Sequence, residues 1–205
     1  MATADALATR AALEDELRAL IASDKLDDAT ARALRGFGPE VMAWLHATVG
    51  GETEASDAFA LFAEELWKSL RRYDQRCSMR TWCYMLARHA AYRVREARAK
   101  GKALPLSQAP VDALAAEVRE TTLVHLRTEV KDRVRALREQ LDPDDQTLLI
   151  LRVDRDLGWR DIALVMLGDE APATEVDKLA VALRKRFERV KARLRELVAA
   201  DAAGS

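Results

Sequence analysis

The sequence contains few of the residues that cross-link, kink or break a polypeptide chain. Its 205 residues include two cysteines, five prolines and eight glycines, and aromatic side chains make up only 5%. Two cysteines cannot build a disulfide framework, and so little glycine and proline excludes collagen-like and low-complexity chains. We therefore expect Cys77 and Cys83 to be reduced and structural.

Long apolar runs and targeting signals are also missing. No stretch approaches about 18 consecutive apolar residues, the length that a membrane-spanning helix needs. Acidic residues lie near the N-terminus, where a signal peptide has basic residues before an apolar run. We expect a cytoplasmic protein that does not bind or cross a membrane.

Signatures of catalysis and of metal binding are equally scarce. The sequence has no glycine-rich phosphate loop, no nucleophile elbow and no cluster of histidines and cysteines at metal-ligand spacing. Its three histidines, His46, His89 and His125, all lie in helical segments, where packing or surface roles are far more common than catalysis. We therefore expect a protein that is not an enzyme and has no catalytic residue, no metal site and no cofactor.

Charge is arranged in alternating blocks along the chain. The total is −1, but residues 1–57 carry −6, 58–102 carry +7, 103–177 carry −7 and 178–197 carry +6. Two separated basic blocks predict two contacts with a polyanion such as DNA. The acidic blocks are then left for protein partners or for solubility.

Hydrophobic periodicity predicts an all-α fold with two helical domains. A lead-in of residues 1–14 precedes a first domain at 15–100, and a composition rich in small and polar residues predicts a flexible linker at 101–116. A second, helix-turn-helix domain follows at 117–200. In the first domain we expect Gly36–Gly38 to break the chain between two helices. The helices expected there are 27–34, 39–49, 55–70 and 78–100.

Cap residues and apolar spacing near the end of the chain predict two short helices followed by a long basic one. Asp142-Pro143 is a good helix start, Leu157-Gly158 a break, and 159–166 a second short helix. In the long helix one apolar stripe faces inward, made of Leu179, Leu183, Phe187, Val190, Leu194 and Leu197. Such an arrangement places its last helix in the major groove of DNA. The alternative is a three-helix bundle with a solvated charged face.

The first basic block interleaves cations with aromatic residues. Tyr73, Trp82, Tyr84 and Tyr92 all lie within 68–102, which holds eleven Lys and Arg residues. Flat apolar surfaces beside positive charge suit single-stranded DNA. Core packing is the alternative for these rings, with equal weight in the case of Trp82.

Taken in order, the motifs resemble the bacterial RNA polymerase sigma factors of the extracytoplasmic-function group. The resemblance covers about residues 15–197, most of the chain. One segment, Met79–Ala91, is similar to the family's Arg-x-Trp-Leu-x-x-Ile-Ala-Arg-Asn run. The other matching pieces are Gly36–Val41, the Asp57 and Trp67 pair, Leu141–Met166 and Arg184–Leu197.

Membership of this family would imply a dissociable subunit that binds promoter DNA. A loop over residues 73–79 would capture a flipped base of the minus-ten element, the next helix would lie beside the melting strand, and the last helix would face the minus-35 groove. The residues implied to contact DNA are Tyr73, Arg76, Arg80, Trp82, Arg88, Arg93, Arg184, Lys185, Glu188 and Arg189.

The resemblance also implies protein partners, core RNA polymerase and an anti-sigma factor. The residues implied to contact the polymerase are Asp57, Phe59, Ala60, Leu61 and Glu64. Two departures from the family pattern stand out: Ala60-Leu61 replaces a polar Gln-Glu pair, and the turn before the last helix is stretched to 167–176, so that this helix begins near Thr174 or after a longer loop.

Two other functions remain open at this stage. A helix-turn-helix regulator would bind duplex DNA without polymerase. A helical adaptor would bind only protein, with both basic regions simply solvated.

Overall fold

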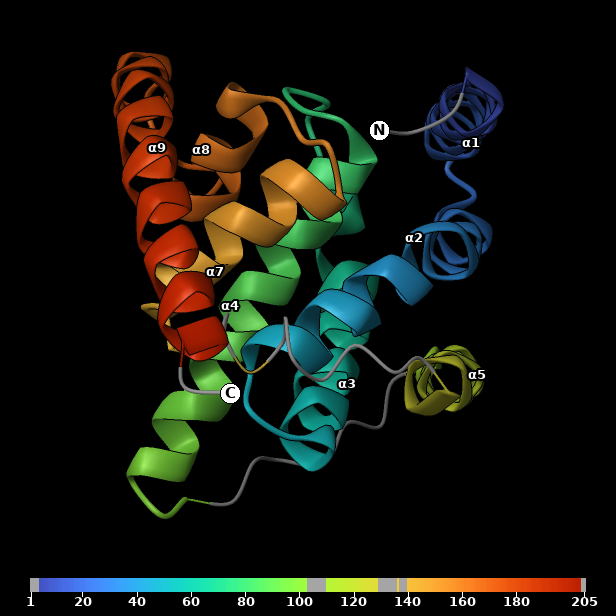
Figure 1. Cartoon of the computed structure of the whole chain (residues 1–205). Coiled ribbons are helices and arrows are strands. Elements are labelled where there is room, and N and C mark those ends of the chain that lie inside the picture. The colour runs from blue at the N-terminus through green and yellow to red at the C-terminus, as the bar shows by residue number, and fades with distance from the viewer. Residues whose placement is uncertain (1–3, 103–109, 129–135, 137–139, 204–205) are drawn as a thin grey trace. The chain divides into compact units, whose positions relative to one another are not determined.

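The computed structural model describes residues 4–102, 110–128, 136 and 140–203. These residues form helices and turns and contain no strand, which confirms the all-α class. The chain divides into two compact units, Ala2–Thr128 and Glu129–Ser205 (Figure 1). We call them the N-terminal unit and the C-terminal unit and describe each by itself.

The N-terminal unit is built around three helices, α2, α3 and α4, with α1 and α5 packed onto them. Helix α3 packs against both α2 and α4, and α5 packs against α2 and α3. Its large core side chains include Phe37, Trp44, Phe59, Phe62, Leu66, Trp82 and Tyr84. The elements are α1 (Ala4–Ala22), α2 (Leu26–Thr48), α3 (Glu52–Ser69), the single 3-10 turn η1 (Leu70–Arg72), α4 (Met79–Ala99) and α5 (Asp112–Thr128).

Helix α2 runs without interruption through Gly36–Gly38 and Pro39, so the expected break there is wrong. The two glycines allow neighbouring side chains to approach closely. A Cβ at Gly36 would lie 2.3 Å from Leu13 Cδ2 of α1, and one at Gly38 would lie 2.8 Å from Val118 Cγ1 of α5. Pro39 removes one helical hydrogen bond. Packing of α1 and α5 onto this segment offsets that loss.

Helix α5 belongs to the N-terminal unit, although the composition placed the start of the second domain at residue 117. Val111, Ala115, Val118 and Leu123 are buried at helical spacing. The last five residues of the expected linker, 112–116, are therefore helical. Residues 103–109 of that linker lie outside the described part of the chain. Local composition could not reveal which unit this amphipathic helix packs against.

Two side chains cap the N-terminus of α4, one through a hydroxyl group and the other through a carboxylate. Ser78 Oγ accepts a hydrogen bond from Thr81 N at 3.0 Å. Glu14 of α1 accepts from Met79 N at 2.9 Å and from Arg80 N at 3.0 Å. A carboxylate at this position satisfies unpaired N–H groups and opposes the positive end of the helix dipole. Helix α1 is thereby fixed to the start of α4.

The C-terminal unit follows the expected order of helix, break, short helix and long helix. Asp142 caps the first helix by accepting from Asp144 N at 2.9 Å, with Pro143 at its first position, as expected. Residues 129–135 and 137–139 of this unit lie outside the described part of the chain. The elements of this unit are α7 (Pro143–Leu149), the π-helical η2 (Ile150–Asp154), α8 (Trp159–Leu167) and α9 (Ala173–Ala203).

Helix α9 packs against α8 and α7, and Figure 1 shows it alongside α8. Leu183, Phe187 and Val190 are buried, which confirms the centre of the expected apolar stripe. Leu179, Leu194 and Leu197 are half-buried. The helix begins at Ala173, one residue from the early start considered at Thr174.

Candidate nucleic-acid interface

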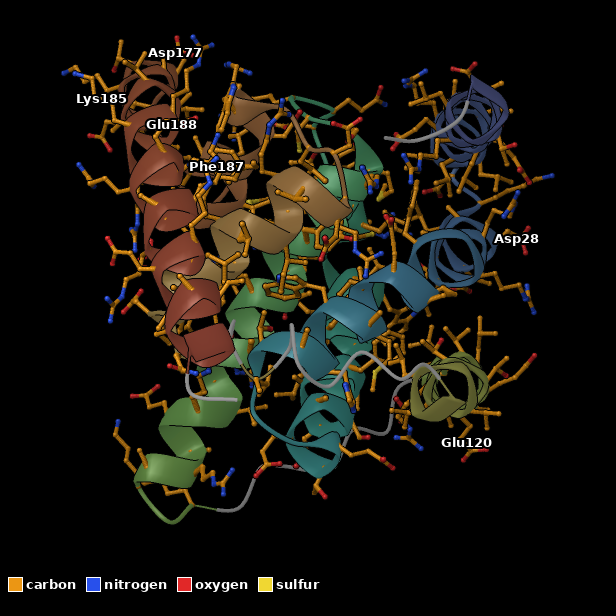
Figure 2. The ribbon with its side chains drawn as sticks, in the orientation of Figure 1. Asp28, Glu120, Asp177, Lys185, Phe187 and Glu188 are labelled. Carbon is orange, nitrogen blue, oxygen red and sulfur yellow. The ribbon has the colours of Figure 1, made fainter. Side chains whose placement is uncertain are left out.

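One side of α9 projects a group of charged side chains away from the core. At 100° per residue they lie opposite the buried stripe. Figure 2 shows Lys185 pointing away from α8, whereas Phe187 points toward it. We call this surface the α9 face, and its exposed residues are Asp177, Lys178, Val181, Arg184, Lys185, Glu188 and Arg189.

The cations of the α9 face are available, whereas its carboxylates already have partners. Asp177 Oδ1 accepts from Arg160 Nε at 3.2 Å, and Glu188 Oε1 lies 2.8 Å from Lys191 Nζ. No carboxylate among the described residues forms an ion pair with the four remaining charged residues of the face, Lys178, Arg184, Lys185 and Arg189. The surface therefore presents net positive charge to solvent.

Aromatic and cation–π contacts lie on the buried side of α9. The rings of Trp159 in α8 and Phe187 lie 5.5 Å apart, edge to face. Arg152 lies 4.7 Å from the Trp159 ring centre, and Lys191 lies 5.0 Å from that of Phe187. Of these contacts, the one between Trp159 and Phe187 joins α9 to α8 and helps to fix the orientation of the helix, as a rigid recognition element requires.

A second brace joins α9 to the start of α7. Arg186 Nε lies 2.5 Å from Asp145 Oδ1, and Arg186 Nη2 lies 3.3 Å from Asp142 Oδ1. Partial burial works to lower the pKa of Arg186, but the hydrogen bond and charge of Asp145 outweigh it and raise the pKa. Arg186 thus stays charged and serves packing, which separates it from the free cations of the α9 face.

In the N-terminal unit the structure buries two aromatic residues expected to contact DNA. Tyr73 and Trp82 are 8% and 2% exposed, with ring centres 5.4 Å apart. The Tyr73 hydroxyl donates to the Cys77 carbonyl oxygen at 2.5 Å, and burial raises the pKa of Tyr73. Neither ring is placed to stack on a base, so the structure gives both a core-packing role instead.

Arg80 is likewise used inside the unit rather than on its surface. Its Nε and Nη2 lie 2.6 and 2.9 Å from the two carboxylate oxygens of Glu40. The two side chains are only 11% and 16% exposed. This paired fork links α4 to α2 across 40 residues of sequence, and a phosphate would have to displace Glu40 to reach the Arg80 fork.

Three of the expected cations do lie on the surface of this unit. Arg76 is exposed and pairs with Asp74 at 2.5 Å, and Arg93 is exposed on α4. The Arg88 guanidinium lies 4.6 Å from the Tyr92 ring centre and donates to the Tyr92 hydroxyl at 2.8 Å. Tyr92, one of the four aromatic residues expected either to suit single-stranded DNA or to pack in the core, is 43% exposed. The four-residue spacing from Arg88 could have indicated it.

Other cations at the C-terminal end of α4 have internal partners. Arg95 donates to the Thr48 carbonyl oxygen, Arg98 pairs with Glu54, and Lys100 pairs with Glu96. The first basic block is therefore less available to a polyanion than its total charge of +7 indicates.

The residues expected to bind polymerase are divided between surface and core. Phe59 and Leu61 of α3 are 0% and 4% exposed, so an expected contact through them is wrong: they pack inside the helical core. Asp57 is exposed, while Ala60 and Glu64 are half-exposed, and Glu64 pairs with Lys68. Of the five expected residues, only these three present surface to a partner.

Comparisons of the chain with models of protein families, with curated proteins and with solved structures gave no match. Function is therefore inferred from the chain's own residues. In the described ranges no three His, Cys, Asp or Glu side chains are grouped to hold a metal ion. Nor does any helix of that part combine the length and the apolar character needed to cross a lipid bilayer.

Proposed function

We propose that the protein is an alternative sigma factor, which binds core RNA polymerase and directs it to promoter DNA. The observation that carries the DNA-binding part of the proposal is the α9 face, where Lys178, Arg184, Lys185 and Arg189 are exposed without carboxylate partners in the described chain. Duplex DNA concentrates phosphate charge, and its binding to free cations releases counterions.

The dimensions of α9 suit the major groove. A helix with side chains is about 10–12 Å across, close to the groove width of about 12 Å. Support from α7 and α8 leaves the opposite side of α9 open along its first half. Arg and Lys at this surface can contact phosphates and guanine edges, which fixes register and supplies sequence information.

The sigma assignment rests on the order of motifs that resemble the family, with the surface of α4 as physical support. Arg88, Tyr92 and Arg93 provide two cations and an exposed ring, the combination that single-stranded DNA requires. Polymerase contact in this proposal uses Asp57 and the half-exposed Ala60 and Glu64.

A DNA-binding regulator that acts without polymerase is the second candidate. The burial of Phe59 and Leu61 favours it, because it removes the two largest apolar residues from the expected polymerase contact. Both candidates share the α9 face, so only the dependence on polymerase separates them.

Purified full-length protein, core RNA polymerase and a random-sequence duplex pool provide the test. A sigma factor elutes with core enzyme on size-exclusion chromatography and retains specific duplexes mainly in its presence. Run-off transcription from the retained duplexes should then depend on both proteins. Separate elution at micromolar concentration, with specific duplex retained by the protein alone, would establish the regulator instead.

A further inference from the structure

The α9 face has one exposed apolar residue at its centre. Val181 is 58% exposed, while the buried side of the same helix is formed by residues such as Leu183 and Phe187. Three- and four-residue spacing places Lys178, Arg184 and Lys185 directly around it. An apolar side chain thus lies among cations that have no carboxylate partner in the described chain.

Neither helix formation nor packing accounts for valine at this position. Valine has a lower helix propensity than alanine because its branched side chain loses rotamer freedom in a helix. A side chain that is 58% exposed gains little from burial in return. Val198 of the same helix is also exposed, at 49%, but only Val181 lies among the cations of the α9 face, where a bound duplex would cover its two methyl groups.

We propose that Val181 determines sequence specificity by contacting the C5-methyl group of a thymine in the major groove. The inference deepens the proposed function and rests on α9 entering duplex DNA. Among the base edges of the major groove only thymine presents a methyl group, and small apolar side chains are its usual partners. The surrounding cations hold the phosphates on either side, so Val181 meets the floor of the groove.

Deoxyuridine tests the contact at the level of one methyl group, because it pairs like thymidine but lacks the C5-methyl. Duplexes are first selected from a random pool by the full-length protein, with and without core polymerase. Each thymine of the selected site is then replaced in turn, and affinity is measured by fluorescence anisotropy. For the native protein one replacement should weaken binding about fourfold, the expected effect of one methyl group removed from water.

Val181→Ala should reduce that discrimination, because alanine keeps only one methyl group and reaches less far toward the thymine. The ratio of the uracil to the thymine dissociation constant should fall from about four toward one. Alanine favours the helix and no buried contact is lost, so circular dichroism should be unchanged. Val198→Ala is the matched control, since Val198 lies on α9, is 49% exposed and falls outside the α9 face. It should keep full discrimination.

The outcomes separate this inference from the proposed function. Specific duplex binding without any position that distinguishes thymine from uracil overturns the role of Val181 alone. Discrimination that persists undiminished in Val181→Ala does the same. Absence of duplex binding in both conditions overturns the DNA-binding function and this inference together.

Discussion

The two basic regions of the molecule use their charge differently. In the N-terminal unit, Arg80 is buried against Glu40, and Arg98 and Lys100 pair with carboxylates. In the C-terminal unit, Lys185 and Arg189 are exposed, and neither pairs with a described carboxylate. Two blocks of nearly equal sequence charge, +7 and +6, therefore differ in what they can offer to a ligand.

The difference shows that the net charge of a segment does not give the number of cations that can bind a phosphate. That number depends on how many of them already pair with a carboxylate. A cation that already holds a carboxylate must lose that contact before it neutralises a phosphate, whereas a solvated cation exchanges only water and counterions. The α9 face is for this reason the stronger candidate for DNA binding. The α4 surface contributes mainly through Arg88, Tyr92 and Arg93.

The largest expected effect comes from breaking the internal pair of the N-terminal unit. Glu40→Ala removes the carboxylate that balances the mostly buried charge of Arg80, which should lower the free energy of unfolding by about 3 kcal/mol. Urea denaturation followed by tryptophan fluorescence measures it. As a control, Glu65→Ala removes an exposed pair with Arg72 and should cost less than about 1 kcal/mol. Equal costs for the two variants would show that burial of the Arg80 pair has no energetic weight.

The second effect concerns the free cations of the α9 face. Lys185→Ala combined with Arg189→Ala should weaken duplex binding about a hundredfold and reduce the salt slope by about two, because two phosphate contacts are lost. Anisotropy titrations between low and moderate salt give both values. The matched control is Arg193→Ala, also on α9 but 3.1 Å from Glu196, which should change binding little. If both variants bound alike, the contrast between paired and free cations would be lost.

Alkaline pH should destabilise the N-terminal unit more than the C-terminal unit. The ordinary pKa values of Cys83 and Tyr73 are 9.0 and 10.0, and burial raises both in the folded protein. The unfolded chain then loses these protons first, so the stability they contribute is present below the ordinary pKa and lost above it. The loss is about 1.4 kcal/mol per pH unit for each group until the folded pKa is reached.

The sequence after Thr128 contains no cysteine and no tyrosine, so the C-terminal unit lacks this source of alkaline instability. Thermal unfolding at pH 8 and pH 10.5 should show selective loss in the N-terminal unit. Fluorescence of a Trp159→Phe variant reports that unit, since the other three tryptophans lie there. Cys83→Ala should reduce the loss, and equal destabilisation of both units would contradict the assignment.

The smallest effect tests how α1 is fixed to the basic helix α4. Glu14→Ala removes two hydrogen bonds to the α4 N-terminus and should lower stability by about 1 kcal/mol. Glu16→Ala, two residues further along α1, removes only an exposed hydrogen bond to Arg32 and should change stability by less than about 0.5 kcal/mol. Chemical denaturation resolves the two. A neutral Glu14→Ala would mean that α1 is held by its apolar contacts alone.

Helix positions were largely predictable because their signals are local. The segments expected at 55–70 and 78–100 correspond to α3 and α4, and the Asp142-Pro143 start corresponds to α7. Spacings of three and four residues and cap residues act within one turn or two. The exposure of Lys185 and Arg189 followed from the same periodicity, since the opposite side of α9 is apolar.

The errors arose where distant segments meet. Gly36 and Gly38 would end a helix in isolation, but α1 and α5 pack against them and the helix continues. The aromatic residues Tyr73 and Trp82 carried the composition of a DNA surface, yet they pack against each other in the core. Composition does not state which side chains another helix will cover.

By itself the sequence determined the helical class, most helix boundaries, the apolar stripe of α9 and the charge of each block. Only the tertiary structure decided that Arg80 belongs to Glu40, that Phe59 and Leu61 are core, and that the α9 cations remain free. The physical reason is the separation along the sequence over which each interaction acts. Helix periodicity acts between residues three or four apart, whereas burial and ion pairing depend on segments tens of residues apart coming into contact.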